Sequence, residues 1–147
     1  PLFYDFVGQD DNGIRYIRLT EDGSLKLNQW DIRELQKAKG AILSAISIIM
    51  KELELVPGDL EKVYLTGSFG GQVDIEAAIS IGMIPQVEKT LVETVANGAG
   101  LGAAIFLSPE GFDRGEKLAR HAEQINLDAD LGFQQQFVDA LALRMRN

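Results

Sequence analysis

Short apolar runs separated by turn-forming residues open the chain. Residues 2–7 and 14–19 combine aromatic and β-branched side chains with polar positions, and residues 25–27 form a third, shorter run. Gly, Asn, Asp and Ser occur in the two segments between them. Because such turns connect neighbouring antiparallel strands, the pattern predicts a small antiparallel strand unit over residues 1–28.

A helical pattern follows from residue 29. Asn28 can accept a hydrogen bond from the first turn, and Asp31 places a carboxylate beside the free amides there. Apolar residues then recur at alternating spacings of three and four, namely Ile32, Leu35, Ile42, Ile46, Ile49 and Leu53. Lys39 occupies a position in this stripe where the spacing requires an apolar residue. We therefore expect a long helix that buries this stripe and ends before Pro57.

The remainder of the chain alternates between strands and helices. We expect a buried strand at 63–65, a helix at 75–81 capped by Asp74, a strand at 91–96, an apolar helix to residue 107, a helix at 109–123 after Ser108, a strand at 124–127 and a terminal helix at 133–145. Such alternation predicts an α/β fold with parallel strands and crossover helices. Two glycine-rich segments follow strands directly, at the sheet edge where ligands bind in open α/β folds.

The charge balance narrows the range of partners. The chain has 147 residues, enough for one domain with a core, and its 14 Lys plus Arg against 22 Asp plus Glu give a formal net charge of −8. A surface this acidic disfavours nucleic acid and anionic membranes. The absence of cysteine excludes disulfides, thiolate metal sites and an iron–sulfur cluster held by this chain. Neither a signal segment nor an apolar run of membrane-spanning length is visible, so the cytoplasm is expected.

The first glycine-rich segment, residues 66–71, has two readings. A planar base or a ribose could lie on Gly67 and Gly70, with the Ser68 hydroxyl as a polar contact. The same glycines could serve only a tight turn from strand to helix. The segment matches neither the phosphate-binding loop that ends in Lys-Ser/Thr nor the dinucleotide fingerprint. The residues by themselves favour neither reading.

The second segment, residues 97–102, and Lys39 also allow alternatives. The segment could present a helix N-terminus to an anion, but the small residues that follow it favour close packing on a sheet.

The Lys39 ammonium must reach solvent, a carboxylate or a ligand, and solvent is favoured by chemistry alone. Gly40 beside it permits a close approach to the helix. His121 is expected on a helix surface, and no catalytic constellation or metal cluster is recognisable.

Three stretches together carry a family resemblance: residues 31–42 (DIRELQKAKGAI), 65–85 (beginning LTGSFGGQVDIEAA) and 96–108 (beginning ANGAGLGAA). Their order and separation resemble the C-terminal region of the reductive activators of corrinoid-dependent methyltransferases. The resemblance covers most of residues 27–137 and is weak at the N-terminus.

The resemblance implies a fold and a function. Members of that family have a ferredoxin-like domain with an iron–sulfur cluster and a large domain of the actin, heat-shock ATPase and sugar kinase superfamily, which is ribonuclease H-like. They use ATP with magnesium to drive electron transfer onto the cobalt of an inactivated corrinoid protein. The resemblance implies that Gly67, Ser68, Phe69 and Gly70 lie against the adenosine. It also places Gln36 and Lys39 on the helix that flanks the nucleotide.

Two departures limit what this chain can do by itself. The phosphate loops of the superfamily are absent, since residues 10–13 are a poor match, and the cluster cysteines are missing. We therefore expect the C-terminal fragment of a larger protein, a single domain over residues 1–147 that forms one wall of a nucleotide cleft. It would contain no catalytic residue, bind no cofactor alone, and have a corrinoid protein as partner. A homodimer, a scaffold that keeps the fold without nucleotide binding, and a small-molecule kinase remain alternatives. The kinase is disfavoured because no catalytic Asp follows a strand in a phosphate loop.

Overall fold

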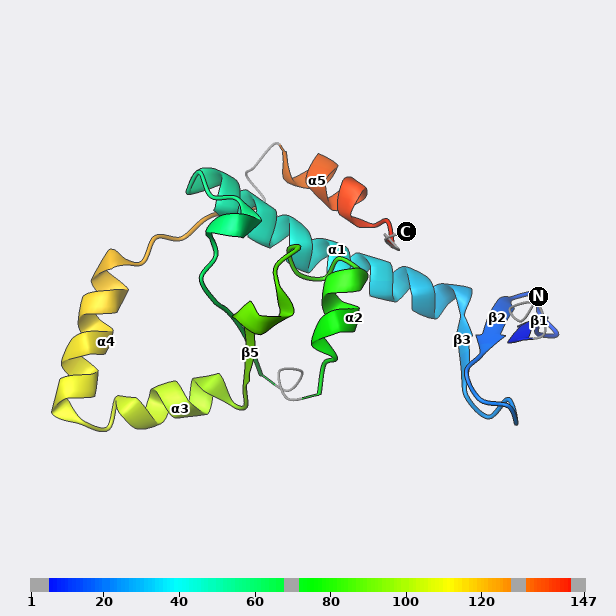
Figure 1. Cartoon of the computed structure of the whole chain (residues 1–147), viewed down its shortest axis with the longest axis horizontal. Helices are drawn as coiled ribbons and strands as arrows, with labels where there is room; N and C mark the ends of the chain where they lie inside the picture. The colour runs from blue at the N-terminus through cyan, green and yellow to red at the C-terminus, as the bar shows by residue number, and fades with distance from the viewer. Residues whose placement is uncertain (1–5, 68–71, 128–131, 144–147) are drawn as a thin grey trace.

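The computed structural model describes residues 6–67, 72–127 and 132–143. A long helix, α1 (Gln29–Glu52), spans the molecule, and Figure 1 shows the other elements arranged around it. A small sheet lies at its N-terminal end, and a helix, α5 (Phe133–Ala140), lies along one side. A two-stranded sheet and the short helix α2 (Ile75–Ser80) approach it from another side. The helices α3 (Gly98–Ile105) and α4 (Pro109–His121) extend away from this body.

The N-terminal sheet has three antiparallel strands in the order β1 (Val7–Gln9), β2 (Arg15–Arg18) and β3 (Lys26–Asn28). The predicted antiparallel strand unit is therefore confirmed. A glycine with positive φ lies in each hairpin turn, Gly13 at 79° and Gly23 at 68°. These left-handed positions explain why both turns contain glycine.

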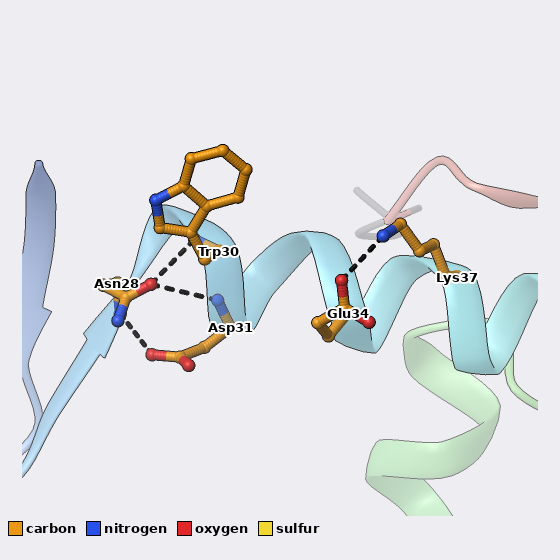
Figure 2. Close-up of polar contacts among 5 residues, drawn as sticks. All are labelled: Asn28, Trp30, Asp31, Glu34 and Lys37. Carbon is orange, nitrogen blue, oxygen red and sulfur yellow. Dashed lines mark hydrogen bonds and ion pairs between the residues drawn. The ribbon is translucent and has the colours of Figure 1, made fainter.

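The start of α1 is capped as its sequence predicts (Figure 2). The Asn28 Oδ1 accepts hydrogen bonds from the backbone N–H groups of Trp30 at 2.7 Å and Asp31 at 3.0 Å. The Asp31 carboxylate accepts in return from the Asn28 N–H at 2.8 Å, which completes a capping box. An exposed ion pair between Lys37 and Glu34, at 2.6 Å, follows one turn later and contributes little to stability.

The face of α1 that the fold buries overlaps the predicted stripe only at Lys39. Its buried residues are Lys39, Gly40, Ser44, Ile48 and Met50. In contrast, Ile42 and Ile49 of the stripe are each 42% exposed and Leu53 is 61% exposed. The prediction was wrong because α5 and the turn after α2 pack on the neighbouring face of the helix, and no periodicity within α1 specifies those partners.

A crossover unit supplies the compact core. Strand β4 (Val63–Thr66) pairs in parallel with β5 (Val92–Val95), and α2 connects them, as predicted. Short 3₁₀ helices lie at Pro57–Asp59 and Lys89–Leu91. The buried residues Ala78, Ile84 and Val92 form a cluster, against which pack Val63, Leu65, Val73, Ile75, Ile79, Met83 and Val87. However, Tyr64 is 59% exposed, so β4 is half-buried rather than the buried strand that its apolar run predicts.

The segments after β5 agree with the prediction in where their helices begin, but α5 ends at Ala140 rather than at residue 145, and the last predicted strand is missing from the described residues. Ser108 caps α4 by accepting from the Gly111 N–H at 3.1 Å, and α5 begins at Phe133 as expected. Residues 122–126 form no regular structure, so the predicted strand at 124–127 is wrong. A strand requires a paired neighbour, and none of the described strands pairs with this segment. Within the described residues, no helix combines the length and apolar character needed to cross a bilayer.

Candidate functional site

The two glycine-rich segments lie at the same edge of the parallel sheet. Thr66 ends β4 and is opposite Val95, which ends β5, so both segments leave from adjacent carboxyl ends. The Thr66 Oγ1 accepts a hydrogen bond of 2.9 Å from the backbone N–H of Gly98, the first residue of α3. A side chain at the end of one strand therefore holds the loop that follows the other.

Gly67 provides an open backbone surface at this edge. Its φ of 86° is a left-handed conformation that favours glycine. A Cβ added at Gly67 would have no described atom within 4 Å, and the residue is exposed. Ser68, Phe69 and Gly70, the other residues of the predicted adenosine loop, lie outside the described residues. Gly67 therefore presents open backbone at this edge, and its role as a ligand contact stays a prediction.

The second segment has a different geometry. Asn97 adopts a left-handed conformation with a φ of 49°, and its side chain accepts from the Gly100 N–H at 3.1 Å. The Gly98 N–H donates to Thr66, and a Cβ at Gly98 would lie 2.4 Å from the Thr66 Oγ1. Since the chain itself satisfies these amides, the start of α3 is poorly suited to hold an anion. Close approach between two chain segments explains Gly98, in agreement with the favoured reading.

Gln36 and Lys39 lie together on α1, and both contact the end of α5. The Gln36 Nε2 donates to the Leu141 carbonyl at 3.0 Å, and the Lys39 Nζ donates to the Ala142 carbonyl. The Lys39 side chain is only 1% exposed, so the expectation that its ammonium reaches solvent was wrong. Carbonyl groups at the C-terminal end of a helix attract a cation, which offsets part of the cost of burying this charge.

Gly40 allows α5 to approach α1 closely. A Cβ at Gly40 would lie 3.3 Å from the Leu141 Cδ2 and 3.5 Å from both the Ala140 carbonyl oxygen and the Phe137 ring. The sequence indicates that something approaches the helix at this glycine, and the structure identifies α5 as the element that does so. Figure 1 shows α5 lying beside α1 over this region.

A cavity of about 340 Å³ lies beside Lys39. Its walls come from α1, from α5 with the residues just after it, and from the region around the end of α2, where Gly82 contributes. The Gln136 Oε1 is buried and has no hydrogen-bond partner among the described residues. Sequence reasoning missed this cavity because Gln136 is one of three consecutive glutamines on a helix, and nothing local marks it as the buried one. Gly67 does not line the cavity.

Gly67 is the described residue of the predicted adenosine loop. An exposed glycine at a strand end leaves bare backbone, the kind of surface against which a base or sugar can lie. The amides at the start of α3 are largely satisfied, and the described residues contain no group of three or more His, Asp or Glu that could hold a metal ion.

Comparison with known proteins identifies the class and then the family. The family model for the C-terminal domain of RACo, the ASKHA domain, matches residues 6–147. The predicted α/β fold of the actin-like ATPase superfamily is thereby confirmed. The chain belongs to the family of these RACo C-terminal domains.

Individual relatives agree with this assignment. The chain is 32% identical over 106 residues to the corrinoid activation enzyme RamQ of Eubacterium limosum. This alignment covers 68% of this chain and 18% of the relative. It is 29% identical over 89 residues to the [Co(II) methylated amine-specific corrinoid protein] reductase of Methanosarcina barkeri, covering 60% and 16% respectively. A solved reductive activator for corrinoid,iron-sulfur protein has the same fold, with a TM-score of 0.81 and 22% identity over 98% of this chain and 24% of that one. This chain thus spans less than a quarter of the length of each relative.

Proposed function

We propose that this chain is the nucleotide-facing part of an ATP-dependent reductive activator, which restores the reduced cobalt state of a corrinoid protein. The observation that carries the proposal is the open, left-handed Gly67 at the carboxyl end of β4, in a chain that belongs to the RACo C-terminal family. The names of two relatives mention corrinoid activation or a corrinoid protein. These names support a corrinoid protein as the partner of the protein that contains this chain. We also propose a cytoplasmic location for that protein.

In this proposal, adenosine lies on the loop that begins at Gly67 and continues through Ser68, Phe69 and Gly70. Gln36 and Lys39 flank the nucleotide from α1. The phosphates and magnesium are held by parts of the activator outside the described residues, and an iron–sulfur cluster supplies the electron from a separate domain. This chain contributes binding and orientation of the base and sugar. It performs neither hydrolysis nor electron transfer.

Titration calorimetry of the complete gene product with ATP and magnesium tests this proposal. We expect binding heat for the wild-type protein and its loss in Ser68→Trp, because an indole would fill the space proposed for the sugar. Ser24→Trp is the matched control, since Ser24 is an exposed turn residue of the N-terminal sheet. The proposal is wrong if the wild-type protein binds no nucleotide, or if both variants retain full affinity.

A scaffold without nucleotide binding is the second candidate, and two observations favour it. The Gln36 and Lys39 side chains already donate to carbonyls of this chain, and the amides of Gly98 and Gly100 are satisfied internally. A scaffold would leave the corrinoid-reactivating activity of the complete protein unchanged in Ser68→Trp. Activity that falls together with nucleotide affinity would exclude the scaffold.

A further inference from the structure

The two side chains proposed to flank the nucleotide are the same two that hold the end of the chain's last helix. Gln36 donates to the Leu141 carbonyl and Lys39 donates to the Ala142 carbonyl, across more than one hundred residues of sequence. The Lys39 side chain is 1% exposed in this arrangement. Both donors are therefore already engaged by carbonyls of this chain, and a nucleotide acceptor has to compete with them.

We propose that residues 140–143 form a latch that competes with the nucleotide for Gln36 and Lys39. This inference rests on the proposed function, because it concerns the regulation of that same site. With the latch closed, two backbone carbonyls accept hydrogen bonds from the two side chains. With the latch open, acceptor atoms of the nucleotide replace them, and α5 is released from α1 at its C-terminal end.

The contact between α5 and α1 contains features that lower its stability. None of the residues of α5 is fully buried, and the helix is only eight residues long. The buried Gln136 Oε1 lacks a partner in the described structure, and the cavity of about 340 Å³ lies along the same contact. An unsatisfied buried acceptor and incomplete packing both lower the stability of a contact. Opening the latch therefore requires less free energy than separating a fully packed helix pair.

Gly40 allows the latch to be weakened without changing either donor. A leucine at this position would collide with Leu141 and with the Ala140 carbonyl, because even a Cβ there lies 3.3–3.5 Å from them. Ala41, the next residue of α1, is exposed and gives a matched control with the same new side chain on the same helix. Gly40→Leu should displace the end of α5, whereas Ala41→Leu should leave it in place.

The first experiment measures nucleotide affinity in the complete gene product by titration with ATP and magnesium. Gly40→Leu should tighten binding by about tenfold, since two hydrogen bonds no longer compete with the nucleotide. Lys39→Met should weaken binding by about tenfold, since it removes a charged donor. The increase in ATP affinity caused by Gly40→Leu should be smaller when Lys39→Met is also present. Ala41→Leu should bind ATP with the affinity of the wild type. If Gly40→Leu binds ATP no more tightly than Ala41→Leu does, the latch proposal is wrong.

The second experiment uses the wild-type protein and does not depend on any variant folding correctly. Backbone hydrogen exchange over residues 133–143 is compared with and without ATP and magnesium. The latch predicts faster exchange at the end of α5 when the nucleotide is bound. If the nucleotide and residues 140–143 compete for the same two side chains, each must weaken the binding of the other. Unchanged or slower exchange overturns the latch while leaving the proposed function intact, provided that binding heat is observed. Absence of binding heat in the wild type and in every variant overturns the proposed function, and the latch with it.

Discussion

The two glycine-rich segments differ in what their glycines do, although both follow a strand of the same parallel pair. At Gly67 the backbone is left-handed and open, with no described atom where a side chain would begin. At Gly98 the backbone is crowded, and an added Cβ would lie 2.4 Å from the Thr66 hydroxyl oxygen. The first glycine is therefore open toward solvent as far as the described residues extend. The second allows one part of the chain to contact another.

The comparison shows that glycine content alone does not identify a binding loop. In the second segment, the N–H groups of Gly98 and Gly100 are already used by Thr66 and Asn97. A segment whose amides are satisfied internally has little to offer an anion. Four substitutions test this difference.

Gly98→Ala should have the largest effect on stability. The methyl group would force apart Thr66 and the start of α3 and break their hydrogen bond, so we expect a loss of about 2–3 kcal/mol in the free energy of unfolding. Urea unfolding of the protein measures it. Gly58→Ala is the control, because a Cβ at Gly58 meets nothing within 4 Å. Equal losses in the two variants would contradict the crowded geometry at Gly98.

Gly67→Ala should cost about 1–2 kcal/mol, because an alanine is strained at a φ of 86°. Gly13→Ala provides a matched control, since Gly13 has a φ of 79° in a hairpin turn of the N-terminal sheet. The two variants should unfold at similar urea concentrations, but only Gly67→Ala should lose nucleotide affinity. A similar loss of affinity in Gly13→Ala would mean that strain, rather than the position of Gly67, causes the effect.

Thr66→Val should cost about 1 kcal/mol, because it removes the acceptor for the Gly98 N–H while keeping the shape of the side chain. Thr66→Ser keeps the hydroxyl and should restore most of the stability. Amide exchange measured by NMR gives a local readout, and the Gly98 amide should exchange faster in Thr66→Val than in Thr66→Ser. Identical exchange rates would show that the hydroxyl does not hold the second segment.

Gly102→Ala should have the smallest effect, and it should be stabilising. Gly102 lies within α3, and a Cβ there would meet nothing within 4 Å. Alanine favours a helix over glycine by up to about 1 kcal/mol. A small rise in the melting temperature is therefore expected, and a fall would indicate that α3 needs this glycine for a contact.

The positions of most elements could be predicted from local signals in the sequence. Asn28, Asp74 and Ser108 each accept a hydrogen bond from the first turn of the helix that follows, and each predicted helix start is confirmed. These signals are local because a capping side chain and the amides it binds lie within three residues of each other. The three motifs also indicate the family from the sequence alone, and the match over residues 6–147 confirms it.

Burial and long-range contacts could not be predicted in the same way. The buried face of α1 depends on α5, and the carbonyl that receives the Lys39 ammonium comes from a residue 103 positions later. The strand predicted at residues 124–127 has suitable local composition, but a strand exists only where a partner strand is available. The family resemblance predicts the site residues from the sequence, whereas the contacts of Gln36 and Lys39 with the residues after α5 depend on the fold.

The single tryptophan of the chain has a consequence for experiments in solution. Trp30 lies in the first turn of α1, is 57% exposed, and has the Arg33 guanidinium 4.9 Å from its ring. Because the indole is more than half exposed in the folded chain, its fluorescence is expected to change little on unfolding. An unfolding curve followed by this signal would report weakly on distant elements such as α3 and α4. Far-ultraviolet circular dichroism, which follows all the helices at once, is therefore the better probe of whether the chain unfolds in a single cooperative step.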